Sequence, residues 1–286
     1  MDEKKGMPGW IKGCLTGCAV LLVLVVILMT VVCQQVKGMF RGVTQAETSR
    51  EQLVKELGDY DEYNPGAQVS VAVDQLERFL RVRESMVDDR ARLDQVFRDF
   101  NLDEALEEES KWRKAFGVIS AVSGLLNPAG EYIAARNAKL LEEEMSIGEY
   151  AWIYGITYYS WLENDLTAGP ELTFKGETRE LFQDGDSPLS PREQHRRYRR
   201  TMDALFRNQI GGLPEGASTR REELEREYGR FENTPRTVLW EGGLPDADAM
   251  VLEPYRNRLE ATWHRSTNLM EMPFEEDRGG IRIGPG

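Results

Sequence analysis

Residues 150–161 read YAWIYGITYYSW, and six of these twelve residues are aromatic. Four of the rings share one helix face, at Tyr150, Tyr154, Tyr158 and Trp161. The other two rings, Trp152 and Tyr159, fall on a second face. Aromatic rings on more than one face predict a central helix that packs on several neighbours. The alternative is that the first face is exposed and forms an interaction surface for a glycan or a partner protein.

A capping box precedes the aromatic segment. Ser146 and Glu149 have the spacing of a helix start, which predicts a helix from Ile147 to Leu166. Apolar residues recur at helical spacing on both sides of it. Further helices are expected over 74–100, 105–126, 129–145, 190–210, 219–231 and 255–263.

Helix breakers and caps separate these segments. Asn127-Pro128 is expected to end one helix, and Ser190-Pro191-x-Glu193 to begin another. The intervening stretch 167–189 is rich in Gly, Pro and Thr and is expected to be irregular. Short strands are conceivable only at 172–174 and 238–240, where the second stretch reads equally well as a buried loop. The fold class is therefore all-α, an irregular multi-helix bundle with at most minor β structure.

The N-terminal region contains 20 consecutive residues without a charge, CLTGCAVLLVLVVILMTVVC, from Cys14 to Cys33. A helix of that length is ~30 Å long, which matches the hydrocarbon core of a bilayer. The run is longer than the apolar part of a cleaved signal peptide, and no small-x-small cleavage site follows it. We therefore expect one uncleaved transmembrane helix, although a processed signal or lipoprotein remains the alternative.

A helical pattern continues beyond this segment to Leu57. Apolar residues follow a 3-4 spacing that one charged residue, Arg50, interrupts. The stripe has two interpretations, a helix that packs on its own domain or a stalk that dimerises as a weak coiled coil. The expected parts of the chain are a short N-terminal tail (1–13), a transmembrane helix (14–33), a juxtamembrane helix (34–58), a helical domain (59–266) and a flexible tail (267–286).

The flanking charges and the cysteines bear on location. Lys4, Lys5 and Lys12 precede the apolar segment and Lys37, Arg41 and Arg50 follow it, so the charge count favours a cytoplasmic N-terminus only narrowly. The layout of a short N-terminal tail before a long C-terminal part is typical of a signal anchor. All three cysteines lie within the segment, so disulfides, thiol catalysis and thiolate metal sites are excluded elsewhere. The chain has no N-glycosylation sequon. We expect a bacterial inner-membrane protein with its bulk on the periplasmic side; the reverse topology would make it a cytoplasm-facing anchored adaptor.

Charge argues against nucleic-acid binding. The chain carries a net charge of −13, which would repel a phosphate backbone. One dense basic run begins at residue 192, and four of its arginines share a helix face, Arg192, Arg196, Arg199 and Arg200. This face is a candidate interaction surface for an acidic partner, or it pairs with acidic helices of the same domain.

Catalytic and metal-binding motifs are not found. The chain has only two histidines, His195 and His264, and no metalloprotease, nucleophile-elbow, P-loop or Rossmann pattern. No catalytic residue, cofactor or metal ligand is therefore assigned. A hydrolase that uses carboxylates near the aromatic helix stays open as an alternative, because such pairs carry no sequence signature.

Two short segments resemble uncharacterised bacterial membrane- or lipid-anchored envelope proteins. They are LERFLRVRE at residues 76–84 and EYAWIY at residues 149–154. The resemblance implies an anchored helical domain and brings no activity or site residue with it. The expected function is an interaction or structural component of the bacterial envelope, which binds another envelope protein or a second copy of itself.

Overall fold

The computed structural model describes residues 41–66, 71–99, 111–170, 191–233 and 238–273, without the side chains of 111–123 and 191. The chain divides into two units, Met1–Arg41 and Gly42–Gly286. The described residues form helices and turns and contain no strand, which confirms the all-α class. No helix among them is long and apolar enough to cross a membrane. The predicted transmembrane helix at 14–33 lies outside the described residues.

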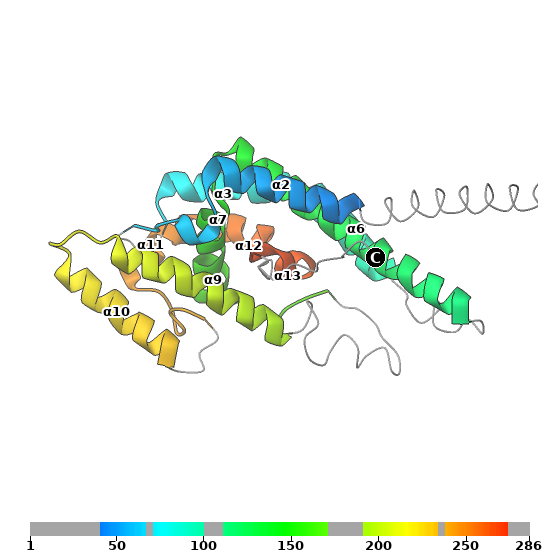
Figure 1. Cartoon of the computed structure of the whole chain (residues 1–286). Helices are drawn as coiled ribbons and strands as arrows, with labels where there is room; N and C mark the ends of the chain where they lie inside the picture. The colour runs from blue at the N-terminus through cyan, green and yellow to red at the C-terminus, as the bar shows by residue number, and fades with distance from the viewer. Residues whose placement is uncertain (1–40, 67–70, 100–110, 171–190, 234–237, 274–286) are drawn as a thin grey trace, which may run out of the picture. The chain divides into compact units, whose positions relative to one another are not determined.

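The aromatic segment lies at the centre of the second unit (Figure 1). It forms α7 (Ile147–Tyr154) and continues without a break as η2, a π-helix over Gly155–Trp161. The Ser146 hydroxyl accepts a hydrogen bond from the Glu149 amide at 3.1 Å, as the capping box predicts. All eight residues of α7 are buried, and α7 contacts α3, α6, α9 and η1. The prediction of a central helix is therefore confirmed, whereas the change to π-helix and its end at Trp161 were not expected.

The other helices surround α7. They are α2 (Arg41–Leu57), η1 (Tyr60–Glu62), α3 (Val73–Ser85), α4 (Val87–Asp99), α6 (Lys111–Glu142), α9 (Pro191–Gly211), α10 (Ser218–Asn233), α11 (Asp246–Leu252), η3 (Glu253–Tyr255), α12 (Arg256–Thr262), η4 (Arg265–Thr267) and α13 (Asn268–Glu271). Most buried apolar side chains form one cluster around α7, and a smaller cluster lies between α4 and α6.

Two further helix boundaries differ from the prediction. The single helix expected over 74–100 is divided at Met86, whose side chain is buried and whose backbone ends α3. Conversely, α6 continues through Pro128, which was expected to end a helix. A proline inside a helix costs about 3 kcal/mol. Here α6 packs against α4 and touches α2, and these tertiary contacts offset the local cost.

Close packing joins α2 to α6. The backbones of Gly42 and Gly130 approach so closely that a Cβ on either would overlap the other helix. The Gly42 amide donates to Asn127 Oδ1 at 3.0 Å. Further along α2, Leu53 is fully buried in the core. These contacts favour the first interpretation of the apolar stripe, a helix that packs on its own domain.

Residues 267–273, which were predicted to belong to a flexible tail, are part of the folded domain. Residues 265–271 form η4 and α13, and all four residues of α13 are buried. The prediction that flexibility begins at 267 is therefore wrong for 267–273, because buried polar contacts hold this segment in the core. Residues 274–286, and the stretch 172–174, lie outside the described residues. At 238–240 the chain forms a turn with Leu239 buried, so the buried-loop reading holds.

Candidate functional site

The structure places three tyrosines of the predicted interaction surface in the core. Tyr150, Tyr154 and Tyr158 are 0% exposed, which rules out a face of exposed rings. Their rings contact one another and Phe79. The fourth residue, Trp161, is half-buried, and the Arg256 guanidinium lies 4.3 Å from its ring centroid.

The predicted arginine face is only partly available at the surface. Arg192, Arg196 and Arg200 are exposed on α9, whereas Arg199 is half-buried. Arg199 donates to the Phe231 carbonyl at 2.8 Å, and its guanidinium lies over the Phe231 ring. Arg196 forms an ion pair with Glu193 on the same helix. Arg196 and Arg199 are therefore engaged in contacts within the domain.

A buried ionic cluster connects α13 to the centre of the fold. Glu271 is 0% exposed and pairs with Arg83, while the Arg136 guanidinium lies 3.7 Å away. The hydroxyls of Tyr132 and Tyr150 each donate to its carboxylate at 2.7 Å. Burial alone would raise the pKa of Glu271, but the two guanidiniums and the two hydroxyls lower that pKa to about 2.

The same segment holds the π-helix in place. Asn268 Oδ1 accepts hydrogen bonds from the hydroxyls of Tyr154 and Tyr159, at 2.9 and 2.8 Å. The hydroxyls of Tyr158 and Thr262 lie 2.8 Å apart. The sequence did not predict this network, because its acidic residue, Glu271, lies within 267–286, the stretch predicted to be a flexible tail. The apolar residues beside it, Leu269-Met270 and Met272, were the available signal.

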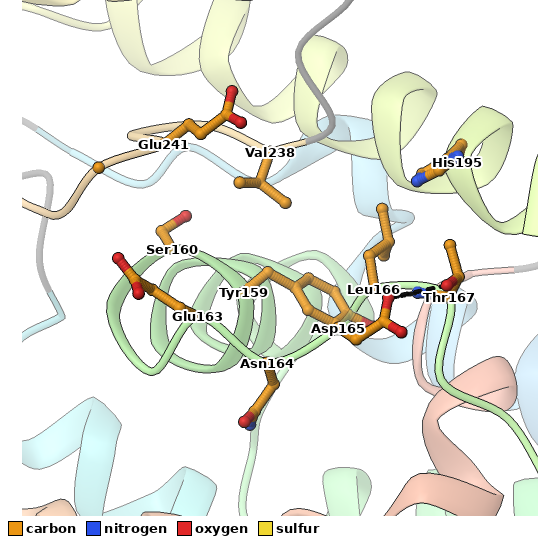
Figure 2. A pocket seen from close by; sticks show the side chains of 11 residues that line it. Tyr159, Ser160, Glu163, Asn164, Asp165, Leu166, Thr167, His195, Val238 and Glu241 are labelled. Atoms are coloured by element: carbon orange, nitrogen blue, oxygen red, sulfur yellow. Dashed lines mark hydrogen bonds between the residues drawn. The ribbon is translucent and has the colours of Figure 1, made fainter.

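The candidate site is a pocket at the C-terminal end of the π-helix (Figure 2). Its volume is about 400 Å³, within the range of small-molecule sites. Its walls come from η2 and the loop after it, from α9, and from the turn at 238–242. The lining residues are Tyr159, Ser160, Glu163, Asn164, Asp165, Leu166, Thr167, His195, Val238, Glu241 and Gly242.

Hydrogen bonds fix the two main walls. The Ser160 hydroxyl donates to the Leu239 carbonyl at 2.6 Å, and the Leu239 amide donates to the Tyr198 hydroxyl at 3.0 Å. On the other wall, Asp165 Oδ1 accepts from the amide and the hydroxyl of Thr167, at 2.8 and 2.7 Å. Hydrogen bonds within the chain therefore fix the positions of both walls.

Unusual backbone conformations border the pocket. Glu163 and Trp240 have φ values of 54° and 52°, a left-handed conformation that L-residues other than glycine rarely adopt. The adjoining η2 is a π-helix, which is also rare. Both features tend to occur at functional sites, because strain is retained where it positions a group.

The pocket is acidic and presents one imidazole. Glu163, Asp165 and Glu241 contribute carboxylates, and among the described lining residues there is no lysine or arginine. Burial lowers the pKa of His195, more than the Asp165 carboxylate raises it. The lowered pKa favours the neutral imidazole, which can accept or donate a hydrogen bond. No group of three His, Cys, Asp or Glu side chains within the described part of the chain could hold a metal ion.

None of the eight predicted interaction residues lines this pocket. Tyr159, which also lines the pocket, belongs to the aromatic segment that the sequence singled out. Apart from Ser160 in η2 and His195 in α9, the remaining lining residues lie in loops and turns, and their approach to His195 depends on tertiary structure. Comparison of the chain with protein-family models, curated proteins and solved structures gives no match.

Proposed function

We propose that the protein is a single-pass, membrane-anchored helical protein of the bacterial envelope that acts by binding, with its domain outside the cytoplasm. The observation that carries the proposal is the uncharged segment Cys14–Cys33 ahead of a folded helical domain that contains no cysteine. A pocket and an exposed basic face supply binding surfaces. The sequence contains no metalloprotease, nucleophile-elbow, P-loop or Rossmann motif, which favours binding over catalysis.

The exposed arginines Arg192, Arg196 and Arg200 favour an acidic segment of another envelope protein as the partner. Self-association through the apolar stripe is less favoured, because its residue Leu53 is already fully buried within the domain. A photo-crosslinking residue at position 192 in the full chain is expected to capture a partner in cells. The matched control is the same residue at Arg226, which is exposed on α10.

Topology is the first experiment. A reporter active only outside the cytoplasm, fused to the C-terminus of the full chain, is expected to be active, and a reporter active only in the cytoplasm is expected to be silent. The opposite result would overturn the envelope assignment and favour a cytoplasm-facing anchored adaptor. Loss of both reporters from the membrane fraction would argue against an anchor at 14–33.

Hydrolysis is the second candidate function, and the pocket favours it. Three carboxylates, from Glu163, Asp165 and Glu241, lie around a cavity next to the aromatic helix, and glycoside cleavage needs two. The test is the release of reducing ends from purified envelope glycan by the full-length protein. Activity that Asp165→Asn and Glu163→Gln both abolish would establish catalysis, and no release above the buffer control would exclude it for that substrate.

A further inference from the structure

The pocket has an apolar centre and a charged edge. Figure 2 shows Val238 pointing toward the wall that carries the Tyr159 ring and Leu166. The carboxylates of Glu163 and Asp165 lie at the two ends of this wall, whereas the side chains of Glu241 and Asn164 point away from the gap. A ligand with an apolar middle and charged ends fits this distribution better than one that is polar throughout.

The hydroxyl groups of the pocket have already donated their hydrogen bonds. The Ser160 hydroxyl donates to the Leu239 carbonyl, and that of Thr167 donates to Asp165. The hydroxyl of Tyr159 donates to Asn268 at 2.8 Å, away from the cavity. Carboxylates only accept at neutral pH. The lining therefore offers an excess of acceptors, and a ligand must supply the donors.

We propose that this pocket binds a small organic dication, an aliphatic diamine whose methylene chain lies on Tyr159, Leu166 and Val238 and whose ammonium groups bind carboxylates at the edge. The inference rests on the proposed binding function and names its ligand class. Each ammonium supplies three donors and a positive charge. A neutral polyol would supply fewer donors and no positive charge.

A metal ion fits the site less well than a diamine. A cation such as Ca²⁺ requires several oxygens that converge on one point. The described residues hold no such group, because the pocket carboxylates are spread around the edge. Separated carboxylates with an apolar surface between them match two separated ammonium groups. Partly exposed pairs contribute modestly, so each pair is expected to change the affinity by roughly two- to fivefold.

Histidine signals provide the readout. The full chain, with 13C-labelled histidine in a neutral detergent, has only two histidines, and one lines the pocket. On titration with 1,5-diaminopentane, the His195 signal is expected to shift saturably while the His264 signal stays constant. 1-Aminopentane is expected to bind several-fold more weakly, and 1,5-pentanediol not to bind.

Carboxylate variants test the assignment. Glu163→Gln and Asp165→Asn are each expected to weaken diamine binding roughly two- to fivefold. The control Glu225→Gln removes an exposed carboxylate on α10, outside the pocket, and is expected to leave the affinity unchanged. Unfolding curves of all three variants check that they fold.

Three results would overturn the inference. They are a linear shift of both histidine signals, equal binding of the diol, and unchanged affinity in both pocket variants. Binding of the diol would instead indicate a hydroxyl-rich ligand such as a sugar. A lysine peptide that competes better than the diamine would indicate a protein side chain as the ligand. None of these results bears on the topology experiment, so failure of the diamine inference and failure of the envelope proposal are distinguishable.

Discussion

Substitution of Glu271 by glutamine tests the buried cluster most directly. The amide keeps the size of the carboxylate and removes its charge. Arg83 and Arg136, which are 1% and 3% exposed, would then carry positive charges with no buried carboxylate to compensate them. The hydroxyls of Tyr132 and Tyr150 would lose their charged acceptor. The cost should therefore appear as a loss of folding free energy.

Two separate arguments give similar values for the free energy of folding that Glu271→Gln removes. Removal of one partner from a buried ion pair costs about 3–5 kcal/mol. Independently, the pKa of Glu271 falls from 4.5 to about 2 on folding, because the guanidiniums outweigh burial. At ~1.4 kcal/mol for each pH unit, this corresponds to about 3 kcal/mol. Since small domains are stable by about 5–15 kcal/mol, the variant is expected to lose a large fraction of its stability.

The sign of the pH dependence follows from the lowered pKa. The stabilisation by Glu271 is fully present above pH 4.5, where the carboxylate is ionised in both folded and unfolded chains. It decreases as the pH falls from 4.5 to about 2, because the unfolded chain takes up the proton first. The Glu271→Gln variant should lack this part of the acid sensitivity.

Urea unfolding of the full-length protein in neutral detergent, followed by tryptophan fluorescence at pH 7, measures the effect. The matched control is Glu253→Gln, which removes an exposed carboxylate paired with Arg256 and should change stability little. A second variant, Arg83→Met combined with Glu271→Gln, should cost less than the sum of the single substitutions. Equal midpoints for the Glu271 and Glu253 variants would refute the reasoning.

Two further predictions concern α2 and the histidines. Gly42→Ala should destabilise the fold by about 1–3 kcal/mol in urea unfolding, because the added Cβ would lie 2.1 Å from the Asn127 carbonyl oxygen. In the control Gly229→Ala the added Cβ meets nothing within 4 Å, and this variant should stabilise α10 by roughly 0.5–1 kcal/mol. Burial lowers the pKa of His195 and of His264 below 6.5, so stability should fall as the pH decreases through 6.5. NMR titration should give a pKa below 6.5 for each histidine, and a value above 6.5 for either would contradict the burial argument.

The contact between His264 and Asp94 and the burial of His264 could be found only from the structure. Its Nε2 lies 2.9 Å from Asp94 Oδ2, a contact that favours the protonated ring. Burial, with Arg90 and Arg83 nearby, outweighs that contact and lowers the pKa of His264. Asp94 lies in a predicted helix and His264 lies 170 positions later, after another, so neither the contact nor its balance with burial was predictable.

Local signals predicted much of the helical layout. The bond between Ser146 and Glu149 spans three residues, and it set the start of α7 as expected. The rings of residues 150–161 predicted a central helix, because aromatic surface on several faces must be buried on several sides. The prediction that a helix ends at Pro128 was wrong, because contacts of α6 with α4 outweigh the unfavourable helix propensity of proline.

The sequence by itself therefore determined the all-α class, the central place of the aromatic segment and the presence of an uncharged stretch long enough to span a bilayer. Only the tertiary structure decided the π-helix, the buried position of Glu271 and the pocket beside His195. The physical reason is the range of the contacts. Capping and periodicity act over a few residues, whereas Arg83 and Glu271 pair across 188 positions, and no local pattern specifies which distant partner compensates a buried charge.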